Sequence, residues 1–309
     1  MHERREPLLA HVSLLFLSFC YNRRIMRALV CVILGLLSGC EQLLGIRDPA
    51  AAVPDGGLPD AGNRDGSSSI PSSPLLLSEV VLAPTEGEMI EIINTSSQDC
   101  ELSTYYLSDS GNYYTVPAPT GLAVSTNDFI VKFPAGAVIA GHKAIVVAID
   151  TSPHFEGVYG VAPSFSIADG SMQAIAMSGL PTLTNEGEPV VLFQWDGQND
   201  LVRDIDIMLV GVPAGMANVF PNKSGVQQDG PDADAFASAY ALDRRTIAPQ
   251  PSAPVSGQST KRIKLESGHE VQDGSGNGEA GNDETSEDTS VTWDTAFTAP
   301  TPFSIDVQP

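Results

Sequence analysis

Cysteine is scarce in this chain, and its placement excludes a domain stapled by disulfides. Three of the four cysteines, Cys20, Cys31 and Cys40, lie near the N-terminus. Only Cys100 remains further on, so the body of the chain has no intramolecular disulfide available unless Cys40 stays unmodified. A catalytic thiol needs a histidine partner, and no local signature of one surrounds Cys100. We expect Cys100 to be a small apolar residue in the core or at its edge.

Basic residues are also few. The chain has 16 lysines and arginines against 38 aspartates and glutamates, and its formal net charge is -22. A surface this acidic repels phosphate backbones, so we expect no nucleic-acid partner. It favours solubility and suits cations or basic partners. The basic residues that do cluster, at 244–245 and 261–264, are expected to form internal ion pairs.

Motifs of catalysis are missing as well. After Cys40 the histidines are His142, His154 and His269, which lie far apart and lack metal-ligand spacing. The chain has no Gly-x-Ser-x-Gly elbow, no phosphate-binding glycine loop that ends in Lys-Ser or Lys-Thr, and no Cys-x-x-Cys pair. We therefore expect a protein that is not an enzyme.

The N-terminal region has the plan of an export signal. Arg27 precedes an apolar run, residues 28–37, that is too short to span a bilayer comfortably and has the length of a signal-peptide core. The run ends in Leu37-Ser38-Gly39-Cys40, which resembles the lipobox of bacterial lipoproteins. Small residues let the peptidase reach the backbone, and the thiol takes the lipid. The resemblance implies cleavage before Cys40 and a lipid anchor on it.

Two alternatives remain for residues 1–39, an ordinary signal peptide and an uncleaved anchor helix. Residues 1–25 contain a second apolar run, so either translation starts at Met26 or the leader has two segments. We expect an exported protein that is lipid-anchored to the cell envelope. Glu41, directly after Cys40, favours the outer membrane.

Residues 40–74 are expected to hold the lipidated cysteine and a disordered, flexible linker. Residues 48–74 are mainly Asp, Gly, Pro, Ala and Ser, with hardly any large apolar side chain. Such a segment cannot bury enough surface to order itself. We place the start of the folded domain near Leu75.

From Leu75 onward the sequence is typical of an all-β domain. Residues 88–94 alternate polar and apolar side chains, the period of a half-buried strand. Gly, Pro, Asn or Asp separates most of the short apolar segments, and none has a sustained helical period with caps. Many short strands with turns predict a sandwich or a barrel. The expected strands are 75–82, 88–94, 102–107, 113–116, 129–133, 144–149, 190–195 and 202–209.

In their order, several of these segments resemble the lamin tail domain, an immunoglobulin-like β-sandwich. The residues that carry the resemblance are Leu77-Ser78-Glu79-Val80-Val81, Glu88-Met89-Ile90-Glu91-Ile92-Ile93-Asn94, Asp99-Cys100-Glu101-Leu102-Ser103, Phe133-Pro134-Ala135-Gly136 and Leu183-Thr184-Asn185-Glu186-Gly187. The match is best over 75–209. Further on, Arg262 stands where the family has an arginine, and Thr301-Pro302 stands where the family closes with Thr-Pro-Gly, here with Phe303 in place of the glycine.

The resemblance implies one immunoglobulin-like β-sandwich over 75–309, with long acidic loop insertions. This sequence departs from the family at Thr104-Tyr105, where the family has Gly-Trp, so we expect the side chains around these two residues to pack differently. The motif residues have structural roles, so the resemblance implies a display module and no chemistry.

One acidic loop has the spacing of a calcium loop. Asp273, Ser275, Asn277, Gly278 and Glu284 occupy positions 1, 3, 5, 6 and 12 of that pattern, and oxygen donors in this order suit Ca²⁺. The alternative is a solvated loop, because no helix signal flanks the segment. A second acidic segment, residues 229–234, could line a cation site together with Asp204 and Asp206, or could simply be a charged surface loop.

Three functions follow from this sequence. The first is a non-enzymatic, lipid-anchored envelope protein whose domain serves adhesion, scaffolding or protein interaction. The second is a calcium-dependent binding module that uses the acidic loops. The third is an accessory subunit of an exported hydrolase.

Overall fold

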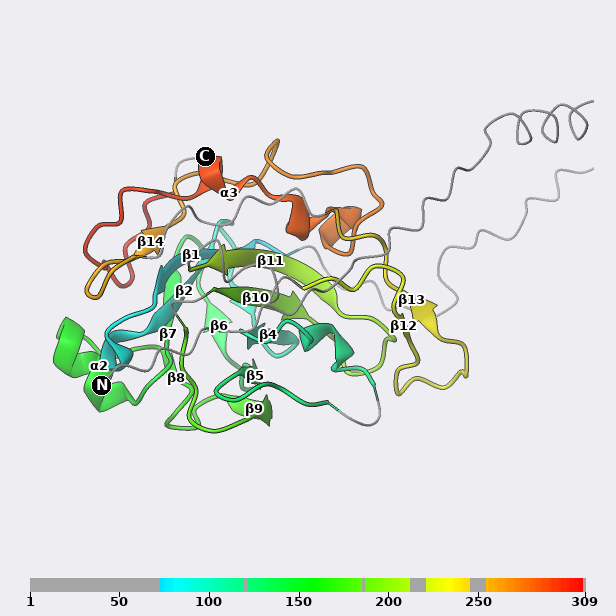
Figure 1. Cartoon of the computed structure of the whole chain (residues 1–309), viewed down its shortest axis with the longest axis horizontal. Coiled ribbons are helices and arrows are strands. Elements are labelled where there is room, and N and C mark those ends of the chain that lie inside the picture. Colours follow the sequence, from blue (N-terminus) through cyan, green and yellow to red (C-terminus); the bar gives the residue numbers. More distant parts are fainter. Residues whose placement is uncertain (1–72, 119–121, 185–186, 212–220, 245–253, 308–309) are drawn as a thin grey trace, which may run out of the picture. The chain divides into compact units, whose positions relative to one another are not determined.

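The short apolar segments after Leu75 pair into two five-stranded sheets (Figure 1). The computed structural model describes residues 73–118, 122–184, 187–211, 221–244 and 254–307. In the first sheet the order is β14 (Thr260–Lys261), β1 (Leu75–Val81), β2 (Met89–Asn94), β7 (Ala144–Ala148) and β8 (Phe165–Ser166). In the second it is β11 (Arg203–Val210), β10 (Glu188–Gln194), β4 (Tyr105–Ser108), β5 (Phe129–Lys132) and β9 (Gln173–Met177).

Neighbouring strands in these sheets are antiparallel, except that β7 and β8 are parallel. Two small two-stranded sheets accompany them: β3 (Cys100–Glu101) with β6 (Val138–Ile139), and β12 (Gln227–Gln228) with β13 (Ser238–Ala239). Short 3₁₀ turns lie at η1 (Thr85–Gly87) and η2 (Tyr113–Thr115).

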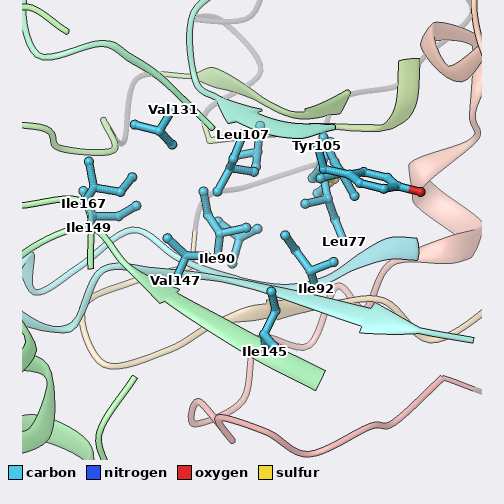
Figure 2. Packing of buried hydrophobic residues seen from close by; sticks show 14 of the residues in the cluster. Leu77, Ile90, Ile92, Tyr105, Leu107, Val131, Ile145, Val147, Ile149 and Ile167 are labelled. Atoms are coloured by element: carbon cyan, nitrogen blue, oxygen red, sulfur yellow. The ribbon is translucent and has the colours of Figure 1, made fainter. Parts of the chain in front are cut away.

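The core lies between the two sheets. Figure 2 shows Ile90 and Ile92 of β2 and Val147 of β7 pointing toward Leu107 and Val131 of the other sheet, and all five are buried. Burial of apolar side chains from both inner faces is what holds such sheets together. The predicted all-β sandwich is therefore confirmed.

Two local predictions were wrong. The segment 113–116 is not a strand, because Tyr113 lies in the 3₁₀ turn η2 and its hydroxyl donates to Asp204. In addition, a helix that the sequence pattern did not indicate, α2 (Ser152–Tyr159), covers the outer face of the first sheet. It is only two turns long and buries Phe155 alone, so it carries too little periodicity to be recognised.

The C-terminal segment, residues 254–307, passes over the edge of the sandwich where β1 and β11 approach each other, drawn in orange and red in Figure 1. It contributes β14 beside β1, the turns η4 (Glu279–Gly281) and η5 (Glu284–Ser286) against β11, and α3 (Thr289–Thr292). All described residues belong to one compact unit, which spans 60–309. None of the helices among them is long and apolar enough to cross a membrane.

Candidate functional site

A buried ionic network joins the two sheets to the C-terminal segment. The pairing register of β1 shifts between Leu77 and Glu79, and the backbone groups of Leu77 bond to side chains there. The Leu77 N–H donates to Asp206 Oδ2 on β11 at 2.7 Å, and the Leu77 carbonyl accepts from Arg262 Nε at 2.7 Å. Arg262 Nη2 in turn donates to both oxygens of Asp206, at 2.9 and 2.7 Å.

The Arg262 guanidinium is fully buried and has further partners. Its Nη1 donates to Glu287 Oε1 at 2.8 Å, its Nη2 lies 3.0 Å from Glu266 Oε1, and its guanidinium lies over the Trp293 ring, 4.9 Å from the centroid. Burial disfavours the charge of Arg262, but the surrounding carboxylates outweigh it and raise the pKa. The arginine stays charged, because a buried ion pair with good geometry keeps both charges.

Carboxylates outnumber the cation in this network. Oxygens of Asp206, Glu266 and Glu287 lie within 4.8 Å of one another, and Glu266 also belongs to a second such group with Glu270 and Glu284. Among the described residues, only Arg262 forms ion pairs with this set of five. The excess negative charge must be neutralised by protons or by a bound cation.

The pKa values show the same imbalance. Burial raises the pKa of Asp206 to about 6, even though Arg262 opposes the shift. Burial, together with the neighbouring carboxylates, raises the pKa of Glu284 well above its ordinary value. Oxygens of Glu270 and Glu287 are buried without a hydrogen-bond partner. An all-carboxylate oxygen set of this kind fits a hard divalent cation such as Ca²⁺.

The residues of the predicted calcium loop bond to different parts of the protein and do not face one common point. Asp273 Oδ1 accepts from the Ser275 N–H and hydroxyl, and Asp273 Oδ2 pairs with Arg244 Nη1 at 2.9 Å. The hydrogen bond from Arg244 lowers the pKa of Asp273 to about 2. Arg244 also donates to the Ser275 hydroxyl. Asp273 and Ser275 thus form an exposed cluster with an arginine.

The other residues of that loop face inward. Asn277 Nδ2 donates to Asp243 Oδ1 at 2.7 Å and to the Ala241 carbonyl at 3.1 Å. Glu284 lies against Gly278, where an added Cβ would come within 2.3 Å of its Oε1. Of the two carboxylates in the predicted loop, Glu284 belongs to a described group that could share an ion and Asp273 does not.

The second predicted cation cluster is not formed as expected. Asp204 Oδ2 pairs with Lys223 Nζ at 2.6 Å, its Oδ1 accepts from the Tyr113 hydroxyl, and Asp206 belongs to the Arg262 network. Both aspartates on β11 thus neutralise buried cations. Asp229 and Asp232 lie instead beside a residue that the sequence pattern did not indicate, Asp200.

The end of the described chain is held by two glutamates of the first sheet. Glu79 on β1 accepts the Thr301 N–H with both oxygens, at 3.1 and 3.2 Å. Glu91 on β2 accepts the Phe303 N–H at 2.5 Å and the Ser78 hydroxyl at 2.8 Å. Glu79 and Glu91 therefore anchor residues 301–303 to the first sheet.

Several simpler predictions can be checked directly. Arg244, Lys261 and Arg262 form internal ion pairs, as expected, whereas Lys264 forms none with the described residues and Arg245 lies outside them. Cys100 is half-buried on β3, with its Sγ 3.7 Å from the Tyr105 hydroxyl oxygen. The lipobox residues Leu37, Ser38, Gly39 and Cys40 lie outside the described residues.

Sequence reasoning missed Glu266, Glu287 and Asp200. Glu266 lies only four residues after Arg262, a local spacing that could have indicated their ion pair. Glu287 and Asp200 have no such signal, because their partners are about 25 to 32 residues away in the chain. Another signal did exist: the basic cluster at 261–264 stands in a strongly acidic chain, which predicts internal ion pairs.

Comparison with known proteins adds little. No protein-family model and no curated protein sequence matches this chain. A crystal structure of a DUF4876 family protein from Bacteroides thetaiotaomicron resembles it with a TM-score of 0.36 and 13% identity, over 73% of this chain and 71% of that chain. A similarity this low indicates neither a family nor a function.

Proposed function

We propose that this chain is a non-catalytic, exported protein that is lipid-anchored to the cell envelope, where its β-sandwich serves adhesion, scaffolding or protein interaction. The observation that carries the proposal is that buried ion pairs connect separate segments of the domain. Arg262 connects β11, the bulge of β1 and the C-terminal segment, and Lys223 joins Asp204 to Asp243. These two cations thus tie separate segments of the domain together, which suits a display module.

The anchor rests on the sequence. Leu37-Ser38-Gly39-Cys40 ends an apolar run of signal length, and the composition of 48–74 is that of a flexible linker. A linker of this length would let the sandwich reach several nanometres from the membrane. The lamin-tail resemblance and the outer-membrane location remain predictions, as does the role of an accessory subunit of an exported hydrolase.

Detergent partitioning and intact mass test the anchor. The full chain expressed in a bacterial host should partition into detergent and begin at a lipid-modified Cys40. The Cys40→Ala variant should lose both properties, and Cys100→Ala is the matched control because it removes the other cysteine of the mature chain. A wild-type protein that is released unmodified would show that the lipobox reading is wrong.

A second function, a calcium-dependent binding module, is favoured by the carboxylates around Arg262. These five carboxylates together can carry more negative charge than the one guanidinium of Arg262 balances. Calcium bound to the native state raises its stability by mass action. Calorimetry at about pH 8 should show a higher Tm in millimolar calcium than in chelator, and the increase should shrink in Glu284→Gln. An unchanged Tm would remove this function.

A further inference from the structure

Asp200 is a buried carboxylate that is only half satisfied. It lies in the turn between β10 and β11, and only 1% of its surface is exposed. Its Oδ1 accepts the Gly230 N–H at 2.7 Å, whereas its Oδ2 has no hydrogen-bond partner. Burying an ionised oxygen without a partner is costly, so a native structure tends to provide one.

A second loop brings two more carboxylates to the same point. The backbone of Gly230 lies so close to the turn that an added Cβ would come within 2.8 Å of the Asn199 carbonyl oxygen. Gly230 directly follows Asp229 and lies two residues before Asp232, so this close approach brings both aspartates near the turn. One oxygen each of Asp200, Asp229 and Asp232 lies within 4.8 Å of the others.

No cation among the described residues balances the charge of this cluster. None of the ion pairs formed within the described part of the chain includes Asp200, Asp229 or Asp232. Three carboxylates this close repel one another unless a cation lies between them. Asp229 is exposed and Asp232 is half-exposed, so an ion can reach the buried Asp200 from solvent.

We propose that Asp200, Asp229 and Asp232 form a solvent-accessible calcium site that joins the β10–β11 turn to the loop between β12 and β13. The oxygen-only donor set selects a hard cation. Calcium accepts the irregular geometry of two loops, with water completing its shell, more readily than magnesium does. The site is separate from the carboxylates around Arg262 and does not rest on the proposed function.

Trp195 provides a local probe for this site. Its indole Nε1 donates to the Asn199 carbonyl at 2.7 Å, next to Asp200, whereas the chain's other tryptophan, Trp293, lies over Arg262. Terbium, which replaces calcium at oxygen sites, emits when it is excited through a nearby indole. Titration of the full chain with terbium should give sensitised emission, and added calcium should remove it.

Variants separate this site from the Arg262 carboxylates. Asp229→Asn, at an exposed position that folding tolerates, should weaken calcium binding about tenfold or more, because one of three charged ligands is lost. Asp200→Asn should do the same, Trp195→Phe should remove the emission but keep calcium binding measured by calorimetry, and Glu284→Gln should keep both. The proposal is overturned if calcium does not displace terbium, or if Asp229→Asn binds calcium as tightly as the wild type.

Discussion

Glu79 and Glu91 are directly opposite each other on β1 and β2, and both carboxyl groups are buried. Burial raises the pKa of Glu91 to about 8, and the facing Glu79 adds to the shift. Both carboxylates accept backbone N–H groups of residues 301–303. The first sheet therefore holds the C-terminal segment with two carboxyl groups whose pKa values are raised by burial.

The metal-free protein should be less stable in alkaline than in mildly acidic solution. Burial raises the pKa of Glu188 to about 8 and that of Asp109 to about 9, so the folded state holds protons that the unfolded chain releases near its ordinary pKa. Raised carboxyl pKa values make the free energy of unfolding fall as pH rises from the unfolded to the folded value. Urea denaturation in chelator should show this fall between about pH 5 and about pH 9. A flat or rising profile would contradict it.

Glu91→Gln should reduce that dependence. The amide stays uncharged at every pH, so the part of the fall that ends near the pKa of Glu91, about 8, should disappear. Each unit of pKa shift corresponds to about 1.4 kcal/mol, so the change in the profile is measurable. Glu101→Gln, at an exposed position on β3, is the control and should leave the profile as it is in the wild type.

Removal of Arg262 should be far more damaging than removal of Arg244. Arg262→Ala leaves Asp206 and Glu287 buried without their cation and should cost about 3–5 kcal/mol of the free energy of unfolding. Arg244→Ala breaks a largely exposed pair with Asp273, which solvent screens, so it should change the free energy of unfolding far less. Urea denaturation of both variants provides the comparison. Equal losses would mean that the Arg262 network adds no more than a surface pair.

Phe303 should carry backbone strain. Its φ is 69°, in the left-handed region that favours glycine. Phe303→Gly and Phe303→Ala remove almost the same contacts but differ in this strain. The glycine variant should be more stable than the alanine variant by about 1 kcal/mol. If the alanine variant is as stable, the left-handed conformation costs nothing here.

Local patterns were enough to locate the central strands. The apolar segment 75–82 and the alternating segment 88–94 contain β1 and β2, because a strand's side-chain period depends only on neighbouring residues. They failed at Tyr113, whose turn is stabilised by a hydrogen bond to Asp204, 91 residues away in the chain. They also do not reveal the partners of the calcium-loop residues, since Asp273 pairs with Arg244 and Glu284 lies with Glu266 and Glu270.

The sequence by itself determined the all-β class, the acidic surface and the predicted lipobox at Cys40, since each depends on composition or on adjacent residues. Only the tertiary structure decided which carboxylates neutralise Arg262 and Lys223, and which ones remain together without a described cation. Arg262 meets Asp206 across 56 residues, and Asp200 meets Gly230 across 30. Such partners are chosen by the packing of the two sheets and the C-terminal segment, which no local spacing encodes.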